Sequence, residues 1–198
     1  MEALQRREQR RRTIRRSIII AIVAVLVLGT GALLFAGKSS TTTTTTSTVA
    51  PTTTTTVAKP VTFSPIPTPL PAGVWGQAPT VTVPAGAPPT KPELANLITG
   101  TGPGAVNGDT LTVQYVLATY SARKVIQSSW TSQPFPFTLG VTSLIPGWVA
   151  GMYGMKAGGR RELILPPAQG YGNLSPGTGI AKNDTLVFVI DLLKLKGK

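Results

Sequence analysis

Residues 134–155 constrain the fold of this chain more than any other segment. They bring together two Phe, a Leu-Ile pair and a Trp, and they interrupt these side chains with Gly and Pro. The segment is too aromatic for an exposed loop, and its Gly and Pro residues argue against a long helix. Apolar and aromatic side chains on short, interrupted elements are typical of the walls of a concave apolar pocket.

The composition narrows what such a pocket can do. The chain contains no His and no Cys, which argues against Ser-His-Asp triads, His/Cys metal sites and redox cysteine pairs. The acidic residues are scattered, so the paired carboxylates of glycosidases are missing as well. We therefore predict a function that depends on shape and apolar surface, with no metal and no organic cofactor.

The net charge of +12 is concentrated at the N-terminus. Seven of the nineteen Lys and Arg residues lie within residues 6–16. Residues 73–198 carry ten basic and five acidic side chains, without the basic cluster interleaved with aromatics that single-strand binders use. We expect no nucleic-acid partner, and we expect Arg160 and Arg161 to form a strand-end pair with one solvated side chain.

Residues 18–36 are apolar apart from Thr30. As a helix, this run spans roughly 28 Å, close to the thickness of the hydrocarbon core of a bilayer. Arg15 and Arg16 precede the run and only Lys38 follows it directly, so the positive-inside rule places the N-terminus in the cytoplasm.

This pattern predicts a single-pass protein of the cell membrane with an extracytoplasmic C-terminal domain. Residues 1–16 form a basic cytoplasmic tail and residues 17–37 a transmembrane signal-anchor. The alternative is a cleaved signal peptide, with small residues at positions 30–32 suited to a peptidase, in which case the chain is secreted.

Residues 38–72 are of low complexity, with two Thr runs followed by closely spaced Pro residues. Such a composition buries too little apolar surface to offset the entropy of ordering the chain. We predict a disordered linker over residues 38–72, which can carry O-linked sugars, and a globular domain over residues 73–198.

Alternating or continuous apolar runs predict the strands of this domain. They lie at residues 94–98, 110–116, 135–139, 161–165 and 185–193. The sequence also predicts one short helix. Pro146 suits its first turn, and Trp148, Met152 and Met155 fall on one face of it. These elements indicate an α+β domain with a bent sheet wrapped on a helix.

Short motifs follow one another through residues 79–195 in a specific order. They are Val113-Gln114-Tyr115, Ser128-Ser129, Pro134-Phe135-Pro136-Phe137-Thr138-Leu139-Gly140, Ile145-Pro146-Gly147-Trp148, Gly154-Met155-Lys156-Ala157-Gly158, Arg160-Arg161-Glu162-Leu163, Pro166-Pro167, Gly170-Tyr171-Gly172 and Asn183-Asp184-Thr185-Leu186-Val187-Phe188. Each is weak alone, but together they make the segment resemble the FKBP-type peptidyl-prolyl cis-trans isomerases, in a membrane-anchored bacterial form. The resemblance implies a five- or six-stranded antiparallel bent sheet wrapped on one short helix.

The resemblance also implies ligands and a site. It implies proline-containing polypeptide substrates, and macrolide inhibitors as candidate ligands. The implied catalytic residues are Tyr115, Gln127, Ile145 and Tyr171. The implied substrate-binding residues are Ile126, Phe135, Phe137, Leu144, Trp148, Ile180 and Phe188. The chain departs from the family pattern at Ile126-Gln127, where Phe-Asp is usual, and at Leu117, where Gly is usual.

Three functions remain open at this point. The first is an anchored prolyl isomerase that acts on exported proteins by desolvating and stabilising the twisted amide. The second is a catalytically weak relative that binds proline-containing segments through the same pocket, and Ile126 and Gln127 favour it. The third is a structural surface module on a stalk, because an isolated buried aromatic residue belongs to a core more often than to a site.

Overall fold

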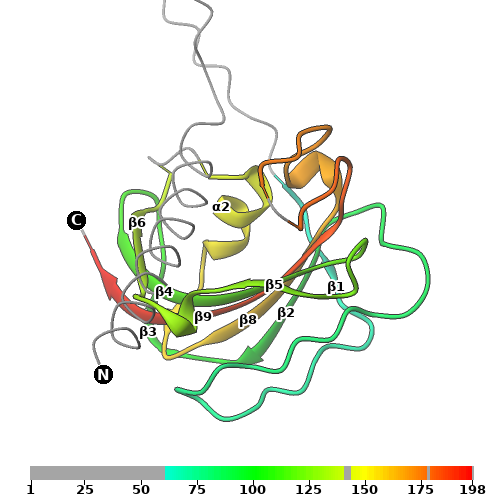
Figure 1. Cartoon of the computed structure of the whole chain (residues 1–198). Helices are drawn as coiled ribbons and strands as arrows, with labels where there is room; N and C mark the ends of the chain where they lie inside the picture. The colour runs from blue at the N-terminus through cyan, green and yellow to red at the C-terminus, as the bar shows by residue number, and fades with distance from the viewer. Residues whose placement is uncertain (1–60, 141–143, 178, 198) are drawn as a thin grey trace, which may run out of the picture.

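The computed structural model describes residues 61–140, 144–177 and 179–197. The predicted cytoplasmic tail, the predicted signal-anchor and residues 38–60 of the predicted linker lie outside these residues. Within the described ranges, no helix is both long and apolar enough to cross a membrane. The described chain forms a curved sheet with one α-helix, α2 (Pro146–Met152), on its concave side (Figure 1).

The main sheet has seven strands in the order β1-β2-β8-β9-β4-β5, with β6 paired to β4. The strands are β1 (Ser64–Pro65), β2 (Glu93–Ile98), β4 (Thr110–Thr119), β5 (Lys124–Ser128), β6 (Phe135–Thr138), β8 (Arg160–Leu165) and β9 (Leu186–Lys196). A second sheet pairs β3 (Thr101–Gly104) with β7 (Lys156–Ala157). Two 3₁₀ turns, Ser129–Thr131 and Pro167–Gln169, complete the described secondary structure.

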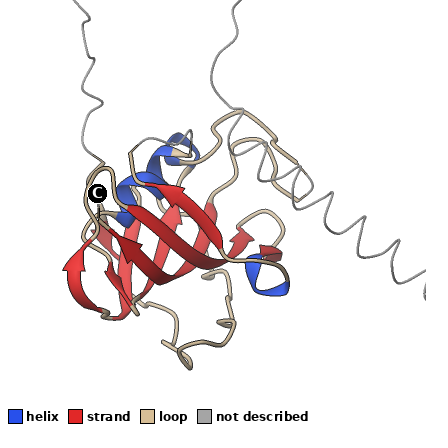
Figure 2. Cartoon of the chain, turned by 90° about the vertical axis from the view of Figure 1, so that its left-hand side faces the viewer, coloured by secondary structure: helices blue, strands red, loops and turns tan. Residues whose placement is uncertain are grey.

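The strand β4 organises the sheet. It pairs along its whole length with β9, while its other edge pairs first with β6 and then with β5. Its side chains alternate between the two faces: Leu111, Val113 and Tyr115 belong to the core beneath α2, and Val116 and Ala118 to a second core on the opposite face. Figure 2 shows the helix on one side of the sheet and long loops on the other.

The predicted bent sheet around one short helix is confirmed, but the sheet differs in two respects from the expectation. It has seven strands rather than five or six, and β1 runs parallel to β2. The extra strand β1 has only two residues and contains Pro65, so it has no sequence pattern of its own. All other pairs in the main sheet are antiparallel.

The helix α2 (Pro146–Met152) begins with a Pro in its first turn, as predicted. Two glycines let it lie close to β8, because a Cβ on Gly147 would come within 2.7 Å of Leu165, and one on Gly151 within 2.6 Å of Leu163. The buried face of the helix carries Trp148 and Met152. Met155 lies beyond the end of the helix, but it is buried in the same core.

Residues 61–84, which we call the strap, cover the outer face of the sheet. Ile66 and Val81 of the strap are buried and pack with Ile164 and Val189 of the sheet. The strap is also hydrogen-bonded, since the N–H of Leu70 donates to a carboxylate oxygen of Glu162 at 2.8 Å. The outer face therefore has a core of its own.

The strap corrects the predicted boundary between linker and domain. Residues 61–72 were expected to belong to the disordered linker, yet they form β1 and bury Ile66. The reason is that Phe63, Ile66 and Leu70 are spaced between the prolines, where they can pack against the sheet. A Pro-rich composition concealed this apolar spacing.

The expectation that one of the two adjacent arginines is solvated is wrong. Arg160 is fully buried, and its guanidinium lies 2.5 and 2.7 Å from the two carboxylate oxygens of Asp191. Its remaining donors bind the carbonyls of Ala72 at 2.8 Å and Gln77 at 2.7 Å, which fixes both ends of one turn of the strap.

Arg161 is buried on the opposite face of β8. It donates to the carbonyl oxygens of Gly151 at 2.5 Å and Tyr153 at 3.0 Å, and to Oδ1 of Asn96 at 2.8 Å. Burial lowers the pKa of Arg161 to about 10. The side chain therefore satisfies the carbonyl groups at the C-terminal end of α2, where a cation is favoured.

Candidate functional site

An apolar pocket lies between α2 and the inner face of the sheet. It has an empty volume of about 290 Å³, part of which is open to solvent, and most of its lining is apolar. The lining residues come from four strands, from α2 and from the loops beside them: Tyr115, Leu117, Gln127, Phe135, Leu144, Trp148, Tyr171 and Phe188. Strand alternation explains the contribution of β4, because Tyr115 and Leu117 lie two residues apart on the same face.

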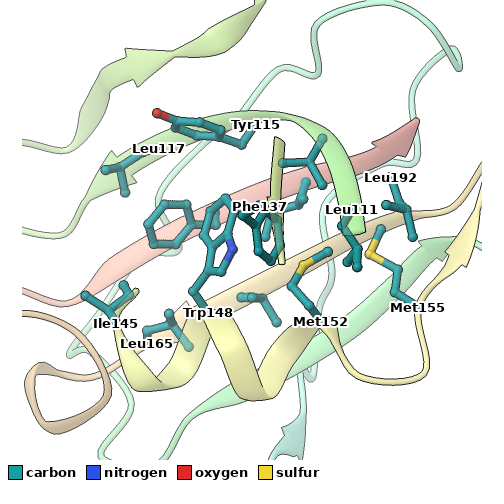
Figure 3. Packing of buried hydrophobic residues seen from close by; sticks show 14 of the residues in the cluster. Leu111, Tyr115, Leu117, Phe137, Ile145, Trp148, Met152, Met155, Leu165 and Leu192 are labelled. Atoms are coloured by element: carbon teal, nitrogen blue, oxygen red, sulfur yellow. The ribbon is translucent and has the colours of Figure 1, made fainter. Parts of the chain in front are cut away.

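Trp148 is the centre of a group of aromatic rings. Its ring lies 5.4 Å from that of Tyr115 and 5.0 Å from that of Phe188, in both cases nearly perpendicular, at 89° and 82°. Figure 3 shows Trp148 rising from α2 toward β4, with Tyr115 and Leu117 beyond it. Phe135 adds a further edge contact to Tyr115 at 6.5 Å. Such edge-to-face pairs favour one arrangement of the rings, so the walls are held in a defined shape.

The polar groups of the pocket are neutral. Burial raises the pKa of Tyr115 to about 12. Burial, with a smaller contribution from Tyr115, raises the pKa of Tyr171 as well. The third polar side chain, Gln127, has no titratable group. The site can therefore form hydrogen bonds and exclude water, but the described residues that line it offer no carboxylate, imidazole or amine for proton transfer.

Ser129 positions Tyr115. Its hydroxyl oxygen accepts the backbone N–H of Tyr115 at 2.8 Å, and the hydroxyl itself donates to the side-chain carbonyl of Gln114. Ser129 is buried at the start of a 3₁₀ turn directly after β5. It therefore ties the end of β5 to the part of β4 that carries the Tyr115 ring.

The loop that carries Tyr171 is tied to the end of β4 by Asp184. Its carboxylate accepts hydrogen bonds from the backbone N–H groups of Ser121 at 3.1 Å and Ala181 at 3.3 Å, and from the hydroxyl of Ser121. Within the loop, the N–H of Asn183 donates to the carbonyl of Gly172 at 2.7 Å. These contacts hold the Tyr171 side of the pocket against the sheet.

The structure brings seven of the eleven predicted site residues into the pocket lining. These are Tyr115, Gln127, Phe135, Leu144, Trp148, Tyr171 and Phe188. Phe137, Ile145 and Ile180 are instead buried in the surrounding core, and Ile126 packs against that core without lining the pocket. The catalytic roles assigned to Tyr115, Gln127, Ile145 and Tyr171 stay predictions.

Sequence reasoning missed three residues of the site. Leu117 lines the pocket, but it lies one residue beyond the predicted strand 110–116; β4 extends to Thr119, and its spacing of two residues from Tyr115 was a signal that could have found it. Ser129 and Asp184 position the walls through hydrogen bonds. Both residues stand in motifs of the family resemblance, but those motifs do not say which backbone groups the two side chains bind.

The sequence matches known proteins over this same part of the chain. The family model for FKBP-type peptidyl-prolyl cis-trans isomerase matches residues 102–193. An FK506-binding protein of Streptomyces anulatus is 41% identical over 119 residues, which cover 59% of this chain and 96% of that protein. A probable FK506-binding protein of Corynebacterium glutamicum is 37% identical over 121 residues, covering 59% and 98% of the two chains.

Among solved structures, the crystal structure of FkpA from Escherichia coli has 33% sequence identity and a TM-score of 0.48, over 54% of this chain and 49% of that chain. The match to relatives that this chain covers almost completely defines the class of protein: the chain belongs to the FKBP-type peptidyl-prolyl cis-trans isomerase family. Its described part is the isomerase domain, and the family is one of enzymes.

Proposed function

We propose that this protein isomerises Xaa-Pro peptide bonds in exported polypeptides, from a position at the outer face of the cell membrane. The observation that carries the proposal is the pocket with Trp148 at its centre, which is narrow, lined mainly by aromatic side chains, and free of titrating groups near neutral pH. The location rests on the sequence alone: the apolar run at residues 18–36 and the arginines before it.

The proposed mechanism needs no proton transfer and no covalent intermediate. The barrier to rotation about the peptide bond is about 18–20 kcal/mol and arises from amide resonance. The uncatalysed step for Xaa-Pro bonds takes tens to hundreds of seconds. In the twisted transition state, resonance is lost and the amide carries less charge separation than in the planar ground state. An apolar pocket therefore binds the twisted form more tightly than the planar one.

The required preference is modest. A thousandfold acceleration corresponds to about 4 kcal/mol of differential binding. In this mechanism the prolyl ring packs on Trp148, and the hydroxyl of Tyr171 and the backbone N–H of Ile145 donate to substrate carbonyl groups. The relatives are named for binding FK506, so FK506-like macrolides are candidate competitors for the same pocket.

The test is NMR exchange spectroscopy of short Xaa-Pro peptides with the full-length chain in detergent micelles. We expect faster cis-trans exchange with the native chain, a loss of at least tenfold for Trp148→Ala, and a smaller loss for Tyr171→Phe, which removes only one hydroxyl. Trp75→Phe is the matched control, because Trp75 is 39% exposed on the strap and does not line the pocket. Equal rates for native chain and Trp148→Ala would exclude the proposal.

The second candidate is a proline-binding module with weak turnover. It is favoured by Gln127, which lines the pocket and brings an amide rather than a carboxylate. Shifts of peptide resonances without faster exchange would support this candidate. Gln127→Asp separates the two: a large gain in rate would mark the natural domain as attenuated, and an unchanged rate would show that the carboxylate is dispensable.

A further inference from the structure

Leu117 is one of the residues that line the pocket. It is 1% exposed on the inner face of β4, two residues beyond Tyr115. Its partner across the ladder to β9 is Phe188, and its partner on the other side, in β5, is Gln127. Both partners line the pocket. The Leu117 side chain therefore occupies the row of the sheet that would otherwise extend the pocket between Phe188 and Gln127.

This side chain has little freedom to move aside. At Leu117 the backbone of β4 pairs with β9 on one edge and with β5 on the other, and the β5 pairing shifts register directly after this residue. Close-packed interiors leave a buried side chain little empty space to move into. Phe188 is braced by the perpendicular contact with Trp148 at 5.0 Å. The empty volume of about 290 Å³ includes space that is open to solvent, so the enclosed part of the pocket is smaller than this value.

We propose that Leu117 sets the size limit of this pocket: it admits the small ring of a prolyl residue and disfavours the bulkier ring systems of FK506-like macrolides. The inference rests on the proposed function, because it assigns the pocket to a prolyl ring. It adds a specificity-determining residue that contacts the ligand through shape alone. It also states which ligand class gains when this residue is shortened.

The physical basis of this selectivity is the cavity that a shorter side chain at position 117 leaves. Replacing Leu117 by Ala opens apolar space that is continuous with the pocket, between an aromatic ring and the stem of Gln127. Apolar cavities bind apolar groups that fill them, and one methylene in an apolar pocket is worth roughly 10- to 200-fold in discrimination. A large apolar ligand gains these contacts, whereas a prolyl ring that already fits does not.

The experiment compares two ligands with the full-length chain in detergent micelles. The dissociation constant of FK506 is measured by calorimetry, and kcat/KM by exchange of a short Xaa-Pro peptide. For Leu117→Ala we expect the ratio of FK506 affinity to peptide kcat/KM to rise at least about tenfold. Leu117→Phe, which fills the pocket further, should move the ratio in the opposite direction.

Leu111→Ala is the matched control. Leu111 is also fully buried on the inner face of β4, but it lies six residues away, about 20 Å along the strand, and does not line the pocket. The same atoms are removed, so a general loosening of the core would change both variants alike. We expect the ratio for Leu111→Ala to stay at the native value.

A safeguard is needed if Leu117→Ala does not fold. Leu117→Val removes a single methylene and should shift the ratio in the same direction by a smaller factor, with melting temperatures recorded for every variant. An unchanged ratio in folded Leu117 variants, or an equal change in Leu111→Ala, overturns the inference. The proposed function still stands in that case if the native chain accelerates peptide exchange. Native chain that binds FK506 without accelerating exchange overturns the proposed function instead.

Discussion

At the scale of single residues, the polar groups that line the pocket stay uncharged near neutral pH. Burial raises the pKa of Tyr115 to about 12 and that of Tyr171 further from its ordinary value, so both hydroxyls stay protonated near neutral pH. Because the lining offers no other titratable group, we expect kcat/KM for a neutral Xaa-Pro peptide to vary less than about twofold between pH 6 and pH 9. A bell-shaped profile over this range, in a chain that stays folded, would contradict the proposed mechanism.

A buried acid on the outer face couples stability to pH. Glu162 is fully buried, and one of its carboxylate oxygens has no hydrogen-bond partner in the described part of the chain. Burial raises the pKa of Glu162, Glu93 raises it further, and the N–H of Leu70 lowers it in part. The net shift is upward from an ordinary value of 4.5, so at pH values between the ordinary and the raised pKa the folded state binds more protons at Glu162 than the unfolded state does.

The sign follows from that difference. The free energy of unfolding rises as pH falls from neutral through the raised pKa, and the rise is complete below the ordinary pKa. Glu162→Gln keeps an acceptor for the N–H of Leu70 but cannot ionise, so we expect it to be more stable than the native chain at pH 7 and to show a smaller dependence of stability on pH. Urea unfolding at several pH values measures this, and an identical slope in both proteins would refute the assignment.

The buried ion pair between Arg160 and Asp191 differs from Glu162, because each of its charges has a partner of opposite sign. Arg160 and Asp191 are both buried, and each satisfies the other. Removing one partner leaves an uncompensated charge, which typically costs about 3–5 kcal/mol. We expect a loss of this size for Arg160→Met in urea unfolding and a large recovery in the double variant Arg160→Met with Asp191→Leu. Additive losses in the double variant would show that the two side chains stabilise the fold independently.

These residues mark the limit of sequence reasoning at this scale. Tyr115 and Trp148 were predictable because motifs of fixed spacing surround them. Burial of Arg160 was not, because its stability depends on Asp191, which is distant in sequence, and on two carbonyl groups of the strap. A pair of adjacent arginines at a strand end is usually solvated, and only the tertiary contacts reverse that expectation.

At the scale of elements, the strap defines where the domain begins. A chain that starts at residue 73 lacks β1, the buried Ile66 and the N–H of Leu70 that donates to Glu162. Full burial of one large aliphatic side chain is worth about 1.5–3 kcal/mol. We therefore expect the fragment 73–198 to be less stable than the fragment 61–198 by at least about 2 kcal/mol.

Urea unfolding of the two fragments measures this difference. Peptide exchange at a temperature where both are folded provides the control: no residue of the strap lines the pocket, so we expect similar turnover in the two fragments, although Phe63 of the strap packs against the inner core. Equal stability would mean that residues 61–72 pack without stabilising the domain.

The strands that the sequence predicted are either long or part of the aromatic segment. Strands β2, β4, β8 and β9 have six or more residues with apolar or alternating patterns, and β6 lies within the aromatic segment. The strands that were missed, β1, β3, β5 and β7, have two to five residues. Such short strands depend on a partner strand rather than on local pattern, so their existence is a tertiary property.

At the scale of the whole molecule, one sheet serves two cores. Trp148 belongs to the inner core beneath α2, and Trp130 packs against the outer core. Because both cores share β4 and β9, we expect them to unfold together. The test uses two variants that both carry Trp75→Phe. One retains only Trp130 and the other only Trp148, and the fluorescence of each is followed through urea unfolding.

Coincident transitions for Trp130 and Trp148 are the expected result, with circular dichroism as an independent reference. A Trp130 signal that changes at lower urea would show that the strap and outer core form a separate cooperative unit. The family to which the chain belongs was predictable from motif order. Its membrane location stays a prediction from residues 17–37.

The parallel strand β1 has a consequence for how the sheet meets other polypeptide chains. An open sheet edge can pair with a strand of another chain, and such pairing leads to aggregation. Here the edge beyond β2 is occupied by a two-residue strand whose second residue is Pro65, with Pro67 close behind. Proline has no N–H to offer, so the sheet ends in a segment that a strand of another chain cannot readily extend.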